Sequence, residues 1–312
     1  MKIVLLFLAS LSLAQAHCEF PAQPVVLISS SQVLIQYWDL PSQDLLTESS
    51  LPKSDSFQSY QQKIRDQISV DTNFLLQRYL KLNPTPGDAH NILQTVGRPQ
   101  NFKPIGCLEA LLLEVQINRN PQMTTNPTEF LAAYLQKDGR LKVYFLTNDE
   151  EGLRGVGLDP LKTQIAKDLK LGWKYISNLH NHSFFLEGLS TNKPQGVLAP
   201  SEADMQLFKS HQEELGLQGA SITNGFETVH ISTSELSLYR AVRQITPRTL
   251  PQVYSPSTVS AHGLDQESRF NLDDDRLRAS AVTASGTRTK FRAVFRRLVR
   301  DRVVSRGMHM FA

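Results

Sequence analysis

The chain has 312 residues, a formal net charge of +3 at pH 7 and two cysteines. After the N-terminal segment, no run approaches the ~20 consecutive apolar residues that a membrane-spanning helix needs, so we expect the mature chain to be soluble. Two cysteines are too few for the closed, cysteine-rich sites that hold structural zinc, which favours chemistry over structure as the use of any zinc bound here.

Residues 1–16 have the pattern of a secretory signal peptide. A single lysine precedes a mainly apolar run, and Ala14-Gln15-Ala16 forms an A-x-A cleavage site. We therefore expect a secreted or periplasmic protein. Two cysteines in an oxidising compartment are more often paired than free, so we expect a disulfide between Cys18 and Cys107.

The pattern of residues 17–103 predicts a short pair of strands followed by helices. The apolar runs Val25–Ile28 and Val33–Ile35 flank a serine cluster, as in two short strands. Helical spacing of large apolar side chains follows from residue 57 to residue 79, and a proline-rich turn ends it. This region is expected to be either a small helical prodomain or packing that completes the rest of the fold.

The segment from Gly106 to Ile117 is nearly continuous in apolar residues, and we predict a strand here. It contains two acidic residues, Glu109 and Glu114. In a regular strand Cys107 and Glu109 share one face, so the disulfide would hold the N-terminus near that face. The alternative is that Cys107 is a fourth zinc ligand, which would make the metal site structural.

His180-Asn181-His182 ends a predicted strand. Residues 159–171 have the pattern of a helix, and residues 173–179 have that of the strand which follows. Side chains two apart on a strand point to the same face, so His180 and His182 can present both imidazoles to one metal ion while Asn181 faces away.

A carboxylate follows at the start of the next predicted helix. Ser201-Glu202-Ala203-Asp204 is a capping box, which starts a helix with or without a metal. There, Asp204 would complete a tripod with His180 and His182. Three protein ligands with a fourth position left for water are typical of catalytic zinc. The alternative is a structural secreted protein in which both motifs are coincidental.

These motifs resemble those of the JAMM (MPN+) metalloproteases, including their bacterial RadC-like relatives. The family pattern is an upstream glutamate, then a helix and a strand ending in His-x-His, then Ser-x-x-Asp opening another helix. Here the matching residues are His180-Asn181-His182 and Pro200-Ser201-Glu202-Ala203-Asp204, with Gly172-Trp173 before the strand. The resemblance covers residues 104–232 and implies a JAB/MPN-like α/β fold, a mixed sheet flanked by helices, for a catalytic domain at 104–240.

The resemblance also implies an activity. Zn²⁺ held by His180, His182 and Asp204 would support hydrolysis of peptide or isopeptide amide bonds, with cell-wall peptide as one candidate substrate. The competing expectation is a catalytically inactive JAB-like module that binds a peptide in the same groove. Two features depart from the family pattern: Ser183 stands where the family has proline, and residues 184–199 are an insert that could form a lid or substrate rim.

Two further catalytic roles follow from the resemblance. The family's glutamate acts as general base from the first strand of the domain, and its spacing fits Glu109 rather than Glu114. The family's motif serine stabilises the oxyanion, a role that would belong to Ser201.

The C-terminal part of the chain consists of three segments that differ in composition. Residues 220–223 and 227–231 have the pattern of two strands that close the sheet. Residues 241–287 are expected to be a loosely ordered linker. Residues 288–312 are predicted to contain a basic amphipathic helix, because 288–306 hold eight Lys or Arg and one Asp. It would dock on its own domain or contact an anionic surface. A nucleic-acid partner is not expected of a secreted chain.

Overall fold

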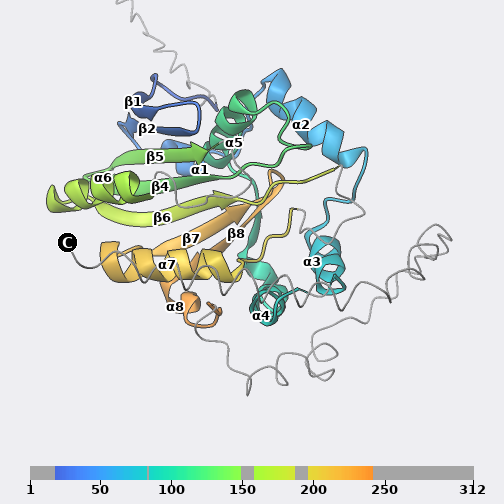
Figure 1. The fold of residues 1–312 in the computed structure, drawn as a ribbon. Coiled ribbons are helices and arrows are strands. Elements are labelled where there is room, and N and C mark those ends of the chain that lie inside the picture. The colour runs from blue at the N-terminus through green and yellow to red at the C-terminus, as the bar shows by residue number, and fades with distance from the viewer. Residues whose placement is uncertain (1–17, 83, 149–157, 187–195, 242–312) are drawn as a thin grey trace, which may run out of the picture. The chain divides into compact units, whose positions relative to one another are not determined.

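One sheet of eight strands runs through the residues that the computed structural model describes, which are 18–82, 84–148, 158–186 and 196–241 (Figure 1). The strands are β1 (Val25–Ser29), β2 (Val33–Leu40), β3 (Phe102–Pro104), β4 (Phe130–Lys137), β5 (Arg140–Asn148), β6 (Lys174–Asn181), β7 (Gly219–Thr223) and β8 (Glu227–Ser232). Their order across the sheet is β1-β2-β5-β4-β6-β7-β8-β3. The β6/β7 pair is parallel, whereas the other neighbouring pairs are antiparallel, so the sheet is mixed.

Helices cover both faces of this sheet. They are α1 (Asp44–Thr47), α2 (Asp55–Arg65), α3 (Thr72–Leu80), α4 (Pro86–Val96), α5 (Cys107–Arg119), α6 (Leu158–Lys170), α7 (Glu202–Leu215) and α8 (Thr233–Leu236), with a short 3₁₀ turn, η1, at Pro99–Asn101. Figure 1 shows α6 and α7 along one side of the sheet and α2 and α5 along the other. The predicted α/β class, with a mixed sheet flanked by helices, is confirmed.

Alternating side chains of β4 connect the two layers. Leu131 belongs to the apolar core that includes Ile165 of α6 and Phe208 of α7. Its neighbour Phe130 belongs to the opposite core, with Leu112 of α5. Successive residues of a strand point to opposite faces, so β4 anchors both layers.

The N-terminal part of the chain contributes strands to the same sheet. The predicted pair of strands is confirmed as β1 and β2, which pair antiparallel, and β2 continues the sheet by pairing with β5. Short β3 closes the opposite edge on β8. The predicted helical run is two helices, α2 and α3, and Pro86 then begins α4 at its first turn, where proline is favoured.

The strand predicted for residues 106–117 is wrong, because this segment is the helix α5. Most of its side chains are buried, so the apolar residues are spread around the helix and the helical period is hidden. A run of this kind cannot be assigned from periodicity alone. The alanine, leucine, glutamate and glutamine of the segment all favour a helix. Cys107 and Glu109 therefore do not share one face of a strand, as had been expected.

The predicted disulfide is confirmed. Cys18 and Cys107 are bonded, with their Cα atoms 5.5 Å apart. The bond joins the start of the described chain to the first residue of α5 and closes a loop between residues 89 apart in sequence. Cys107 has no free thiolate, so the alternative in which it is a zinc ligand is wrong.

Several sequence predictions lie outside the described residues. These are the signal peptide at 1–16, the linker from residue 242 onward, the basic helix within 288–312 and the middle of the 184–199 insert. Within the described ranges, no helix combines the length and apolar character needed to cross a membrane.

Candidate metal centre

Strand β6 delivers two histidines to one place. His180 lies near its end, paired with Leu131 of β4 and Ile222 of β7. His182 follows the strand, and its backbone N–H donates to the carbonyl of Thr223 at 2.9 Å, which extends the pairing with β7. The two imidazole centroids are 4.9 Å apart. The rings therefore lie side by side, as the spacing predicts.

Asn181 faces away from the two rings. Its Oδ1 accepts from the backbone N–H of Phe130 at 2.6 Å, and its Nδ2 donates to the hydroxyl of Ser183 at 2.8 Å. The side chain is buried and fixes the start of β4 against the end of β6. Ser183, which stands where the resembled family has proline, thereby takes part in holding the histidine strand.

The cap of α7 brings a carboxylate to the histidines. Ser201 Oγ accepts from the Asp204 N–H at 3.2 Å, and Asp204 Oδ2 accepts from the Ser201 N–H at 2.8 Å, which completes a capping box. The same carboxylate places Oδ1 3.4 Å from His180 Nε2 and Oδ2 3.2 Å from His182 Nε2. The three predicted ligands therefore converge, and Asp204 both caps the helix and faces the imidazoles.

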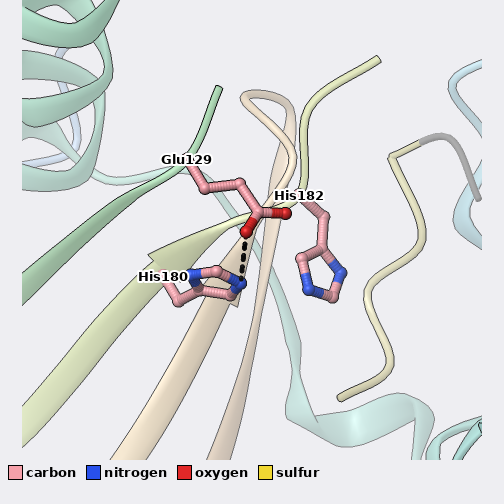
Figure 2. Close-up of side chains that lie close together, drawn as sticks. All are labelled: Glu129, His180 and His182. Carbon is pink, nitrogen blue, oxygen red and sulfur yellow. Dashed lines mark ion pairs between the residues drawn. The ribbon is translucent and has the colours of Figure 1, made fainter. Parts of the chain in front are cut away.

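A second carboxylate, which the sequence patterns did not indicate, lies beside them. Glu129 immediately precedes β4, and its Oε2 is 3.7 Å from His180 Nε2. Glu129, His180 and His182 can each direct one ligand atom so that all three atoms lie within 4.8 Å of one another, a separation that a single metal ion can bridge. Figure 2 shows the carboxylate above the two rings, which it reaches from the segment that enters β4.

Glu129 could have been found from the turn that follows its strand. Asp138-Gly139 is a strong hairpin signal between two largely apolar runs. Both residues have positive φ, 49° and 78°, as the tight type I′ turn requires. The hairpin joins β4 to β5, and the other edge of β4 pairs with β6, with Glu129 immediately before β4.

The structure does not bring Glu109 to the histidines. Its carboxylate caps α5, accepting from the Gly106 N–H at 3.0 Å, and also accepts from the Thr228 hydroxyl at 2.6 Å. Burial raises the pKa of this carboxyl, against the lowering effect of those hydrogen bonds. Glu114 lies further along the same helix. Neither glutamate lines the cavity in which the histidines lie, whereas Glu129 does.

Backbone carbonyls hold the far side of each imidazole. His180 Nδ1 is 3.3 Å from the carbonyl of Phe130, and His182 Nδ1 is 2.5 Å from that of Val197. A carbonyl can only accept, so each Nδ1 carries the proton and each Nε2 is the atom available to a ligand. Metal-binding histidines are oriented in the same way.

The electrostatics of the centre favour a cation. Burial lowers the pKa of His182, but the hydrogen bond and charge of Asp204, with the charge of Glu129, outweigh it and raise this pKa to about 9. Burial also raises the pKa of Asp204, yet the imidazoles of His180 and His182 hold it well below its usual range. The carboxylates therefore stabilise positive charge between the rings, which a divalent metal ion can supply in place of a proton.

The centre opens into a cavity of about 600 Å³. Helices α3, α4, α6 and α7, together with the segment leading into α7, supply the rest of its wall. Besides the four groups above, the lining residues are Tyr79, Asp88, Ile92, Leu158, Ser183, Val197, Ala199, Pro200, Ser201, Ala203, Gln206, Leu207 and Ser210.

Helix α4 anchors the segment that enters α7. Asn91 is fully buried, and its Nδ2 donates to the carbonyls of Pro200 and Arg240, both at 3.0 Å. Its Oδ1 accepts from the Arg240 N–H at 2.7 Å. One turn earlier, Asp88 Oδ1 accepts from the Glu202 N–H at 3.0 Å. These bonds fix the backbone on both sides of Ser201.

No family model matches the sequence, and neither curated proteins nor solved structures give a match. The function is therefore inferred from the site itself.

Proposed function

We propose that the protein is a zinc-dependent metallopeptidase of the JAMM type, which hydrolyses peptide or isopeptide amide bonds. The observation that carries the proposal is the convergence of His180 Nε2, His182 Nε2 and the Asp204 carboxylate, with Glu129 beside them. Two imidazoles and one carboxylate are a zinc donor set that leaves a coordination position open. The same set can hold Fe²⁺, so elemental analysis is part of the test.

The order of elements supports the resemblance to the JAMM family. Glu129 enters β4, α6 and β6 follow, β6 leads into His-x-His, and Ser-x-x-Asp then opens α7. The family's upstream glutamate, sought at Glu109, is thus replaced in the proposal by Glu129. The 184–199 insert still separates the histidines from Ser201, and its described end holds His182 through the carbonyl of Val197.

The chain supplies a base and a hydrogen-bond donor around the ion. When bound, zinc lowers the pKa of water and polarises a carbonyl. The Glu129 carboxylate is placed to take a proton from the attacking water and to pass it to the leaving amine. Ser201 Oγ accepts from the Asp204 N–H, so its own hydroxyl proton can be donated to the oxyanion of the substrate.

The proposed cellular location follows from the N-terminal segment. Residues 1–16 favour a secreted or periplasmic location, where extracellular proteins or cell-wall peptides are the candidate substrates. The basic region at 288–306 would favour contact with anionic surfaces there. The disulfide of the described structure agrees with an oxidising compartment.

Metal removal tests the activity. Chelation is expected to abolish hydrolysis of internally quenched peptides, including lysine-linked branched ones, and stoichiometric zinc is expected to restore it. Product formation is followed by fluorescence and mass spectrometry. Hydrolysis that persists in metal-free protein would exclude the mechanism. Zinc binding without hydrolysis of either class of peptide would instead favour the inactive peptide-binding module.

The anchoring role of Asn91 gives a separate prediction. Asn91→Ala leaves buried backbone groups of Pro200 and Arg240 without partners and is expected to lower the free energy of unfolding by about 2–3 kcal/mol. Because the freed segment carries Ser201 and Asp204, zinc affinity is expected to fall about 10-fold or more. Chemical denaturation and zinc titration check the two effects.

Gln94→Ala, at a partly exposed position of the same helix, is the matched control and is expected to change neither quantity. Wild-type zinc affinity in the Asn91 variant would show that α4 does not position the ligands.

A further inference from the structure

The cavity beyond the metal centre has one charged side chain on its described wall. Asp88 is that residue, and no lysine or arginine lines the cavity among the described residues. With zinc bound, the carboxylates of Glu129 and Asp204 balance the two positive charges of the ion, since the histidines bind as neutral imidazoles. No cationic side chain among the described residues then compensates the charge of Asp88.

Asp88 lies next to an apolar surface that leads to the histidines. Ile92 is one helical turn beyond Asp88 and shares its face of α4. It packs with Tyr79, Val197 and Ala199, all of which also line the cavity. The carbonyl of Val197 holds His182, so this apolar wall is continuous with the metal centre.

The charge of Asp88 shifts the pKa of neighbouring groups in this wall. Burial raises the pKa of Tyr79 to about 12, and the nearby charge of Asp88 contributes to the rise. The same charge contributes to raising the pKa of Glu202, after burial. No ion pair joins Asp88 to a basic side chain of the described residues. In the described structure the wall therefore combines an apolar surface with a carboxylate that has no cationic partner, which suits a long side chain that ends in a cation.

We propose that Asp88 is a specificity-determining residue that selects substrates carrying an amine or guanidinium side chain close to the scissile amide. This inference rests on the proposed peptidase function. The stem of the substrate side chain lies along Tyr79 and Ile92, and its charged end pairs with the Asp88 carboxylate. The purely structural alternative is that Asp88 serves only to accept from the Glu202 N–H at the start of α7.

Asp88→Asn separates the two roles, because asparagine keeps an oxygen that can accept from Glu202 but has no charge. The substrates are sets of peptides that differ at one position, which carries lysine, the neutral straight-chain norleucine or glutamate. That position is moved stepwise along both sides of the scissile bond. Glu213→Gln removes an equal charge from an exposed position of α7 outside the cavity lining and is the matched control.

At one position, the zinc-loaded wild-type chain is expected to prefer lysine over norleucine by about tenfold in kcat/KM, which corresponds to about 1.4 kcal/mol. Asp88→Asn is expected to remove this preference by slowing only the lysine peptide, with unchanged zinc content and melting temperature. High salt is expected to reduce the wild-type preference. Glu213→Gln is expected to behave as wild type.

Hydrolysis without preference at any position, or a preference that survives in Asp88→Asn, would overturn the inference and leave the peptidase function standing. Equal slowing of lysine and norleucine peptides in Asp88→Asn would assign Asp88 to the helix cap alone. If the zinc-loaded wild-type chain hydrolyses none of the peptides, the proposed function and the inference both fall.

Discussion

Glu129→Gln is expected to lower kcat/KM by about 10²–10⁴-fold while the protein keeps its zinc. Glutamine preserves the size of the side chain but cannot take a proton from water at neutral pH. The carboxylate is 3.7 Å from His180 Nε2 and faces the cavity, so its loss removes the base without emptying the ligand set. Steady-state kinetics and elemental analysis on the same preparation measure both effects.

Glu109→Gln is the matched control for that experiment. Glu109 is the glutamate that the family spacing favours, but it caps α5 and bonds to Thr228 outside the cavity. Its substitution is expected to affect stability and to leave kcat/KM within about twofold of wild type. Full activity in the Glu129→Gln variant would contradict the role of Glu129 as the base. Loss of activity in a folded, zinc-loaded Glu109→Gln variant would instead favour Glu109, the residue that the family spacing favours.

His182→Ala and Asp204→Asn are each expected to weaken zinc binding by more than about 100-fold. Loss of a group that merely orients a ligand costs about 10–100-fold, and loss of a ligand removes a direct bond to the ion. Asparagine at position 204 keeps an oxygen that can accept from the Ser201 N–H, so the helix cap survives while the charged ligand is lost.

Competition with a chromophoric chelator at fixed pH measures these affinities. His230→Gln is the control, because His230 lies on β8, is exposed and does not line the cavity. Its affinity for zinc is expected to equal that of wild type. If His182→Ala and Asp204→Asn also bind zinc as tightly as wild type, the ion is held elsewhere.

The motifs that carry the proposed ligands were predictable because they are local. His180 and His182 depend only on the period of a strand, and Asp204 depends on a four-residue capping pattern. The preceding helix, now α6, also has clear periodicity, because Leu161 and Ile165 are buried on one of its faces. The strand β6 is instead buried on both faces along its second half. The convergence of His180, His182 and Asp204 could be expected from the order of elements, without knowledge of tertiary contacts.

The proposed general base was not predictable by the same means. Residues 106–117 are buried on most sides, so the pattern does not separate a buried strand from a buried helix. The strand predicted there contains Glu109. Glu129 instead stands immediately before β4, the first strand of the hairpin of β4 and β5 that Asp138-Gly139 marks.

The far wall of the cavity depends on long-range contacts. Asn91 reaches Pro200 and Arg240 across more than 100 residues of sequence, and Asp88 reaches Glu202 in the same way. These are single side-chain bonds between separate elements, which no periodic pattern encodes. For this reason the sequence left open whether residues 17–103 form a small prodomain or packing that completes the fold, whereas in the structure α3 and α4 line the cavity.

The most direct test of the proposed metal centre is a zinc-edge anomalous difference map from crystals of the zinc-loaded protein. We expect one strong peak per chain, bonded to His180 Nε2, His182 Nε2 and the Asp204 carboxylate, with Glu129 facing its open side. Zinc–nitrogen and zinc–oxygen distances of about 2.0–2.2 Å are expected. No peak between the two histidines, or a zinc ion held by other residues, would contradict it.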